Sequence, residues 1–170
     1  ITEDNSRDDL VEHVYDVTYG VIKSSDSLVI IDDSIVRGTT LKKSILKMLD
    51  RLRPKKIVIV SSAPQVRYPD CYGIDMANLD SLIAFKATLA LLKDKKKYGL
   101  VKEIYNKCKG QTHLPDKEIV NHVKEIYNMF TADEISDKIA EILSIYVNNS
   151  KVKIIYQSIE NLHEACPDHT

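Results

Sequence analysis

Short runs of apolar, β-branched residues alternate along the chain with longer stretches of helical periodicity. Residues 28–31 (Leu-Val-Ile-Ile) and 57–60 (Ile-Val-Ile-Val) are continuous apolar runs of strand length. Between the runs, apolar residues recur at steps of three or four, at Leu41, Ile45, Met48 and Leu52. This spacing predicts a helix over residues 39–52 that Pro54 ends. The order strand, helix, strand predicts a βαβ unit with parallel strands.

Helical patterns dominate the second half of the chain. One face of a predicted helix carries Leu82, Phe85, Leu89 and Leu92. Asn78 is a candidate N-cap for this helix. Two more helices are predicted, over residues 116–130 with Asp116 as the cap and over residues 131–147. The second begins with the capping-box sequence Thr131-Ala132-Asp133-Glu134.

Two further segments have strand-like composition. Residues 152–156 are short, apolar and β-branched, so they predict a last strand. Residues 13–22 are rich in Val, Tyr and Thr and predict another, although Asp16 and Gly20 weaken the pattern. The fold class that follows is α/β, with a parallel sheet flanked by helices and a mostly helical carboxyl-terminal portion.

Composition narrows the class of protein. A chain of 170 residues that is 44% hydrophobic can form one sizeable core. The 24 basic residues nearly balance the 25 acidic residues, so we expect neither a nucleic-acid partner nor an anionic membrane partner. The apolar runs are far shorter than the roughly 20 residues of a membrane-spanning helix. Three cysteines are too few for a disulfide framework, so we expect a reducing compartment, by default the cytoplasm.

The chemistry that stands out follows the first apolar run, in the sequence Asp32-Asp33-Ser34-Ile35-Val36-Arg37-Gly38-Thr39-Thr40. Here a strand ends in two acids and hydroxyl residues open a helix, whose first backbone N–H groups and dipole favour an anion. Gly38 would let the backbone approach a ligand without an intervening Cβ. The hydroxyls of Ser34, Thr39 and Thr40 would add donors. The sequence therefore predicts a phosphate-binding loop.

The acidic pair suggests a second kind of contact. Adjacent residues on an extended strand project to opposite faces, so Asp32 and Asp33 are poorly placed to act as a general acid and base. Carboxylates accept hydrogen bonds, which suits sugar hydroxyls or a Mg²⁺ ion shared with a pyrophosphate. Near a ribosyl carbon that becomes cationic, they would also stabilise the transition state.

The segment 28–40 resembles the phosphoribosyl pyrophosphate motif of type I phosphoribosyltransferases: an apolar strand, two acids and a loop with hydroxyl residues and glycine. Its string from Asp32 to Thr40 resembles the version found in amidophosphoribosyltransferases. A second stretch agrees with it, because residues 62–69 (Ser-Ala-Pro-Gln-Val-Arg-Tyr-Pro) and 72–76 (Tyr-Gly-Ile-Asp-Met) resemble the segment that follows the next strand in those enzymes. The similar region runs from about residue 29 to 84.

The resemblance implies an activity. In that family, glutamine-derived ammonia displaces pyrophosphate from phosphoribosyl pyrophosphate and gives 5-phosphoribosylamine, the first committed step of purine synthesis. By this resemblance Asp32 and Asp33 would be catalytic and would bind Mg²⁺ and the ribose hydroxyls. The 5-phosphate would be held by Ser34, Arg37, Gly38, Thr39 and Thr40. Arg67 and Tyr68 are expected near the same edge, without an assigned catalytic role.

The resemblance also implies a domain organisation and partners. We expect residues 1–92 to form part of a phosphoribosyltransferase domain, and residues 93–170 to form a helical portion with one late strand, packed on the same domain. Purine nucleotides are the expected feedback ligands, and the full-length enzyme is expected to be a homo-oligomer. The chain starts at Ile1 after no signal region, so we expect an excised fragment of that enzyme.

Some features depart from the family pattern. The family's glutaminase domain carries a nucleophilic cysteine at its mature amino terminus, which this chain lacks, so we expect no glutamine hydrolysis and a fragment competent for binding only. Members with an iron–sulfur cluster place a cysteine directly after the Tyr-Pro of the second motif. Asp70 holds that position here and Cys71 is one residue late, so no iron–sulfur cluster is predicted.

Alternatives remain open at this point. A different type I phosphoribosyltransferase, acting on a purine base or orotate, would need a base-recognition hood that the sequence does not show. A non-catalytic regulator that senses phosphoribosyl pyrophosphate would need a DNA-binding module, which the balanced charge argues against. The spacing of His163, Cys166 and His169 could bind a metal, although a fraying terminal helix accounts for it more simply. Cys71 and Cys108 are expected to be inert thiols.

Overall fold

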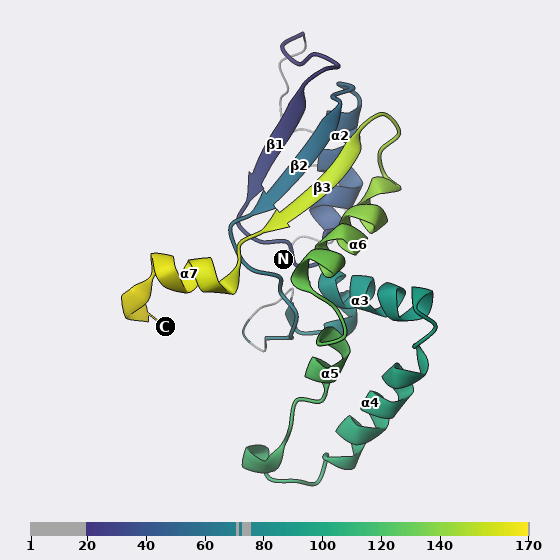
Figure 1. The fold of residues 1–170 in the computed structure, drawn as a ribbon, viewed down its shortest axis with the longest axis vertical. Coiled ribbons are helices and arrows are strands. Elements are labelled where there is room, and N and C mark those ends of the chain that lie inside the picture. Colours follow the sequence, from purple (N-terminus) through teal and green to yellow (C-terminus); the bar gives the residue numbers. More distant parts are fainter. Residues whose placement is uncertain (1–19, 71, 73–75, 170) are drawn as a thin grey trace, which may run out of the picture.

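The computed structural model describes residues 20–70, 72 and 76–169 (Figure 1). The strand predicted over residues 13–22 lies outside this range except for its last three residues, Gly20 to Ile22, which form a turn and an irregular segment. Residues 73–75 of the second motif also lie outside it, as does residue 71.

The sheet consists of three parallel strands. They are β1 (Ser27–Asp32), β2 (Lys56–Ser61) and β3 (Lys151–Tyr156), in the order β1-β2-β3 (Figure 1). The three predicted apolar runs are therefore confirmed as strands, and the α/β class with a parallel sheet and flanking helices is confirmed with them. The register aligns Asp32 with Ser61 and Ser61 with Tyr156, so the strands end together at one edge.

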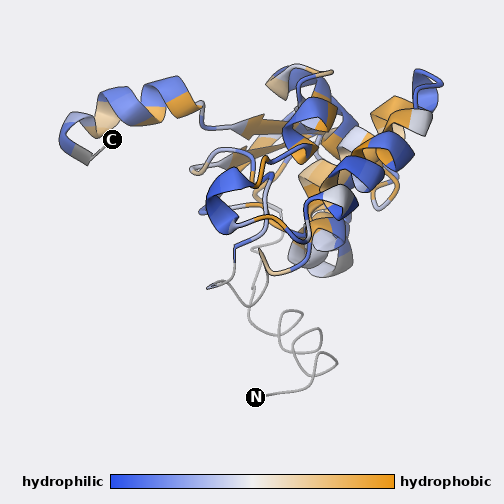
Figure 2. Ribbon diagram, turned by 90° about the horizontal axis from the view of Figure 1, so that it is seen from below, coloured by the Kyte–Doolittle hydropathy of each residue, from blue (hydrophilic) through white to orange (hydrophobic). Residues whose placement is uncertain are grey.

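The two faces of the sheet are covered differently. On one face, side chains such as Ile57, Ile59 and Ile154 are buried in a single core to which η1, α2, α3 and α6 contribute. On the other face, the side chains of Val29 and Ile31 are 63% and 77% exposed. Apolar residues gather between the strands and the helices in Figure 2. The helices of the described residues therefore bury one face of the sheet.

Most of the remaining residues are helical. The α-helices are α2 (Leu46–Asp50), α3 (Ile83–Asp94), α4 (Gly99–Gly110), α5 (Val123–Tyr127), α6 (Ala132–Ser144) and α7 (Ile159–Ala165). A π-helical turn, η1 (Leu41–Ile45), leads into α2, and the 3-10 turns are η3 (Leu79–Ser81), η4 (Asp116–Glu118) and η5 (Pro167–His169). Helix α7 projects away from the sheet and the other helices (Figures 1 and 2).

The helix predicted over residues 39–52 is present but ends earlier. It runs from Thr39 through η1 and α2 to Asp50, and residues 51–52 form a turn. Arg53 has a φ of 54°, in the left-handed region, so the backbone has left the helix before Pro54. The carboxylate of Asp50 accepts hydrogen bonds from the backbone N–H groups of Asn148, Asn149 and Ser150. These bonds connect the end of this helix to the loop that enters β3.

The predicted capping box of α6 is confirmed, whereas the predicted N-cap of α3 is wrong. Thr131 Oγ1 accepts the N–H of Glu134 at 3.1 Å, and Glu134 Oε2 accepts the N–H of Thr131 at 2.8 Å, at the start of α6. Asn78 does not cap α3, because η3 intervenes and Leu82 is the N-cap.

The long helix predicted over residues 116–130 is also wrong. Only η4 and α5 form, and α4 precedes them without having been predicted. The side chain of Gln111 explains the interruption, because its Oε1 accepts the N–H of Val120 at 2.8 Å and its Nε2 donates to the carbonyl of Val120 at 2.9 Å. A side chain from a distant turn thus replaces the helical hydrogen bonds at that point.

Candidate functional site

The predicted phosphate-binding loop leaves the carboxyl end of β1 and enters η1. In parallel sheets ligands bind at this edge, outside the carboxyl ends of the strands. Two hydrogen bonds join this loop to the segment that follows β2. The N–H of Ser62 donates to the carbonyl of Asp32 at 2.9 Å, and Ser62 Oγ donates to the carbonyl of Asp33 at 3.1 Å. The start of the second sequence motif therefore directly supports the first.

The two acids have different surroundings. Asp32 is half-buried at the end of β1, on the helix-covered side, and Asp33 is exposed in the loop. Asp32 Oδ1 accepts the N–H of Asp33 at 3.1 Å, and Asp33 Oδ1 accepts the N–H of Ser34 at 2.7 Å. Burial, together with the charge of Asp33, raises the pKa of Asp32 above its ordinary value. The two carboxylates therefore interact electrostatically although only one lies on the sheet.

Gly38 has a structural reason to be glycine. Its φ is +67°, and a Cβ at this position would lie 2.6 Å from Ile83 Cδ1, in the interior of the protein. The loop also contacts α3 through its backbone, because the N–H of Ile83 donates to the carbonyl of Val36 at 2.9 Å. Gly38 was expected to keep a Cβ away from a ligand, but the absent Cβ points at Ile83. The glycine lets the loop pack on α3.

The helix that follows Gly38 presents its start to solvent. Thr39 and Thr40 are exposed, and the N–H of Lys42 donates to the carbonyl of Gly38 at 3.0 Å to close the first turn. Ser34 and Arg37 are half-buried in the preceding loop. Burial, and then the charge of Lys86 on α3, lowers the pKa of Lys42. The only signal for Lys42 in the sequence is its position two residues after Thr40.

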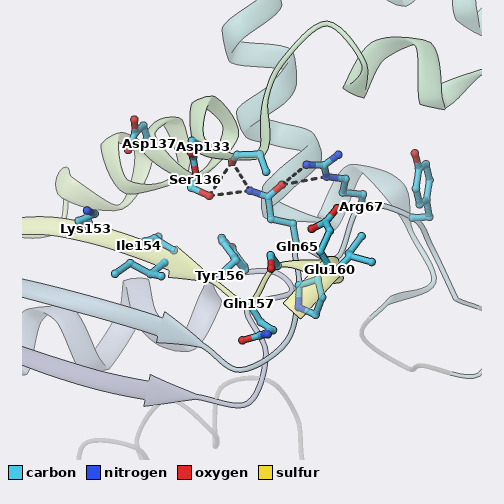
Figure 3. A pocket seen from close by; sticks show the side chains of 16 residues that line it. Gln65, Arg67, Asp133, Ser136, Asp137, Lys153, Ile154, Tyr156, Gln157 and Glu160 are labelled. Carbon is cyan, nitrogen blue, oxygen red and sulfur yellow. Dashed lines mark hydrogen bonds between the residues drawn. The ribbon is translucent and has the colours of Figure 1, made fainter. Parts of the chain in front are cut away.

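Gln65 of the second motif connects its loop to α6 through hydrogen bonds. Its Nε2 donates to the carbonyl of Ala132 at 2.7 Å and to Ser136 Oγ at 2.8 Å (Figure 3). Its Oε1 accepts hydrogen bonds from Nε and Nη2 of Arg67, at 3.0 and 2.8 Å. Gln65 thereby orients the Arg67 side chain. The only signal for Gln65 in the sequence is its place in the second motif.

Arg67 and Tyr68 lie around a buried tyrosine of α5. The Arg67 guanidinium is 5.5 Å from the centre of the Tyr127 ring, and the Tyr68 ring meets that ring edge-on at 5.4 Å between centroids. Tyr127 donates its hydroxyl to the carbonyl of Arg67 at 2.6 Å. Tyr68 and Arg67 line a cavity of about 910 Å³ between this loop, α6, β3 and the start of α7. The structure thus brings both residues toward the carboxyl edge of the sheet.

Asp32, Ser61 and Tyr156 form a polar row across the end of the sheet. They are register partners, so their side chains lie on the same face. The preceding row on this face is apolar and consists of Ile30, Ile59 and Ile154. Burial, with a contribution from the charge of Asp32, raises the pKa of Tyr156. Tyr156 was predicted only as a strand residue, because its partners are more than ninety positions away in the sequence.

The remaining candidates form no additional centre. Within residues 20–70, 72 and 76–169, no group of three or more His, Cys, Asp or Glu side chains is placed to hold a metal ion, and this includes His163, Cys166 and His169. Cys108 is a half-buried free thiol and Cys166 an exposed one, whereas Cys71 lies outside the described residues. None of the described helices has the length and apolar character required to cross a membrane.

Fold and site together define an α/β protein with a phosphoribosyltransferase-like parallel sheet. Comparison with known proteins specifies the similarity: the chain is 49% identical over 59 residues to an amidophosphoribosyltransferase of Haemophilus influenzae, 45% over 58 residues to that of Escherichia coli K12, and 44% over 61 residues to that of Saccharomyces cerevisiae. The chain is thus similar in sequence to amidophosphoribosyltransferases, as its motifs predicted.

These matches cover 34 to 36% of this chain and only 11 to 12% of the length of each enzyme. No family model and no solved structure matches the chain.

Proposed function

We propose that this chain carries the phosphoribosyl pyrophosphate site of an amidophosphoribosyltransferase, which makes 5-phosphoribosylamine from phosphoribosyl pyrophosphate and glutamine. The observation that carries the proposal is the loop from Asp32 to Thr40, which joins the carboxyl end of a parallel strand to an exposed helix start. The identity to enzymes of that name, near 45% over the matched segment, supports it.

In the proposed complex, the loop divides between two parts of the ligand. The backbone N–H groups and hydroxyls of Thr39 and Thr40, with Ser34, Arg37 and the backbone of Gly38, hold the 5-phosphate. The exposure of both threonines and the dipole of the helix support this arrangement. The carboxylates of Asp32 and Asp33 accept hydrogen bonds from the ribose hydroxyls.

The same carboxylates would hold Mg²⁺. Each uses one oxygen for a neighbouring N–H, and Asp33 is exposed, so the pair offers the hard oxygen ligands that this ion prefers. Proteins commonly bind Mg²⁺ through one or two carboxylates and the phosphates of the substrate, which suits a site with two acids. When bound, the ion would neutralise charge on the departing pyrophosphate. Asp32 and Asp33 would stabilise the positive charge that develops on the ribose as that bond breaks.

The wider setting is proposed on the same resemblance. It comprises a glutamine amidotransferase that acts in the cytoplasm as a homo-oligomer, with purine nucleotides as feedback ligands.

Calorimetric titration of the chain with phosphoribosyl pyrophosphate in Mg²⁺ tests the proposal. We expect saturable binding that ribose 5-phosphate displaces, with NMR amide shifts at Arg37, Gly38, Thr39 and Thr40. Asp32→Asn combined with Asp33→Asn should reduce affinity by at least tenfold. Asp133→Asn combined with Asp137→Asn, two acids on α6, is the matched control and should bind within twofold of the unmodified chain.

Two outcomes would contradict the proposal. Amide shifts confined to residues outside the loop would place the phosphate elsewhere. Tight binding, together with no 5-phosphoribosylamine from either glutamine or ammonia in the full-length protein that contains this chain, would favour the non-catalytic sensor.

A further inference from the structure

The hydroxyl of Tyr156 is a buried donor without a partner. Its Oη is inaccessible to solvent and makes no hydrogen bond to any described residue. Buried polar groups are nearly always hydrogen-bonded, because leaving one unsatisfied costs about 1–3 kcal/mol. A tyrosine at this position therefore carries a cost that phenylalanine would avoid, and unsatisfied groups of this kind occur at functional sites.

Strand register places Tyr156 in the same row as an acid of the candidate site. Tyr156 ends β3 on the same face and in the same row as Asp32, which ends β1. In this row only Ser61 of β2, which has a short side chain, lies between them. Figure 3 shows Tyr156 on the side of the sheet where α6 lies, next to Gln65.

The hydroxyl of Ser61 already has a partner, whereas the carboxylate of Asp32 can accept more hydrogen bonds. Ser61 is 1% exposed and donates its hydroxyl to the carbonyl of Ala63 at 2.8 Å. Asp32 Oδ1 accepts the N–H of Asp33, and a carboxylate has the capacity to accept further hydrogen bonds. The contribution of the Asp32 charge to the raised pKa of Tyr156 agrees with their places in the same row.

We propose that Tyr156 is a positioning residue for the ribose-binding carboxylate, and that its hydroxyl donates a hydrogen bond to Asp32 when ligand occupies the site. This inference rests on the proposed function. This hydrogen bond would hold the carboxylate in one orientation while it accepts the ribose hydroxyls, and would also satisfy the buried hydroxyl of Tyr156. Tyr156 would act through Asp32 and would not touch the phosphate.

The anchoring of β3 explains how a residue so distant in sequence can serve this loop. Asp50 holds the loop of residues 148–150 at the other end of the sheet, and β3 pairs with β2 along its full length. The height of Tyr156 relative to Asp32 is therefore fixed by the register.

Substitution of Tyr156 by phenylalanine tests the role, because it removes only the hydroxyl. Titration with ribose 5-phosphate in Mg²⁺ should show about tenfold weaker binding for Tyr156→Phe. Binding of inorganic phosphate, which engages the loop but not Asp32, should stay within twofold. The midpoint of thermal unfolding should be equal to or higher than that of the unmodified chain, since an unsatisfied buried hydroxyl has been removed.

A double-mutant cycle separates positioning from packing. In an Asp32→Asn background, Tyr156→Phe should change ribose 5-phosphate affinity by less than twofold, because the group through which it acts has been altered. Tyr127→Phe is the matched control: it removes a buried tyrosine hydroxyl that is hydrogen-bonded, so it should lower the unfolding midpoint and leave affinity within twofold.

The outcomes distinguish this inference from the proposed function. If the unmodified chain binds ribose 5-phosphate and Tyr156→Phe binds equally well, the role of Tyr156 is overturned and the proposed function stands. A lower unfolding midpoint for Tyr156→Phe, or an undiminished loss of affinity in the Asp32→Asn background, would also overturn it by showing a structural hydroxyl. If the unmodified chain binds no ribose 5-phosphate, both proposals fail.

Discussion

Asp50 and Asp32 lie at opposite ends of the same parallel sheet, and their carboxylates have opposite environments. Asp50 is 5% exposed and accepts hydrogen bonds from Asn148, Asn149 and Ser150. Burial alone would raise the pKa of Asp50, but these hydrogen bonds outweigh it and hold the pKa below its ordinary value. Asp32 accepts one neighbouring N–H, and burial with the charge of Asp33 raises its pKa.

This contrast distinguishes a structural acid, Asp50, from a proposed ligand-binding acid, Asp32. Asp50 closes a network within the protein and fixes the loop before β3. Asp32 lies where the strands end, with acceptor capacity that the described residues do not use fully and with the unpartnered hydroxyl of Tyr156 in its row. A charged group that costs the folded state stability is a candidate for binding. The same substitution at the two acids should therefore have opposite effects.

The largest expected effect is at Asp50. Asp50→Asn replaces one acceptor oxygen with a donor that faces backbone N–H groups, and should lower the free energy of unfolding by about 3 kcal/mol. Urea denaturation followed by circular dichroism measures it. The control is Asp94→Asn, which removes an ion pair between Lys138 and a 58% exposed carboxylate and should cost less than about 1 kcal/mol. Equal stabilities of the two variants would contradict the structural role of Asp50.

Gly38 gives the next largest effect. Gly38→Ala should lower the free energy of unfolding by about 2 kcal/mol, because the residue has a positive φ and its new methyl group meets Ile83. Gly99→Ala is the control, since no atom lies within 4 Å of its added Cβ, and it should be neutral or stabilising by up to about 1 kcal/mol. If Gly38→Ala is as stable as Gly99→Ala, the packing of the loop on α3 is described wrongly.

Asp32→Asn should have a small effect of the opposite sign. The raised pKa of Asp32 means that its ionised form is disfavoured in the folded protein, so the neutral amide should increase the free energy of unfolding, by less than about 1 kcal/mol because the group is half-exposed. The same variant should lose ribose 5-phosphate affinity. A marked loss of stability, measured by the same urea titration, would show that Asp32 is a structural acid like Asp50.

The free energies of unfolding of these two variants, relative to the unmodified chain, should also change with pH in opposite directions. Ionised Asp50 stabilises the fold above its unfolded pKa near 3.8, and this advantage over Asp50→Asn should disappear as pH falls through the lower folded pKa. For Asp32 the direction is reversed: the advantage of Asp32→Asn should be absent below about pH 3.8 and should appear as pH rises through the raised folded pKa.

Urea titrations at pH 3, 5 and 7 measure both trends. Parallel pH profiles for Asp50→Asn and Asp32→Asn would refute the contrast between the two ends of the sheet.

The strands and the loop could be predicted because their signals are local. Continuous apolar runs marked β1, β2 and β3, and a dense motif marked the residues from Asp32 to Thr40. The capping box of α6 was equally local, since Thr131 and Glu134 satisfy each other's backbone. Helix limits were less predictable. Val120 leaves the helical pattern because Gln111 takes over its hydrogen bonds, which no periodicity could reveal.

The sequence alone was sufficient to predict the parallel βαβ unit and to suggest a phosphate-binding loop, because hydrophobic periodicity and turn residues act over a few positions. Which residues lie together at the end of the sheet depends on tertiary contacts that the local sequence does not reveal. Strand register placed Tyr156 in the row of Asp32 and Ser61, and packing against Ile83 gave Gly38 its requirement for glycine. Both depend on contacts between segments far apart in the chain, whose pairing is set by the core as a whole.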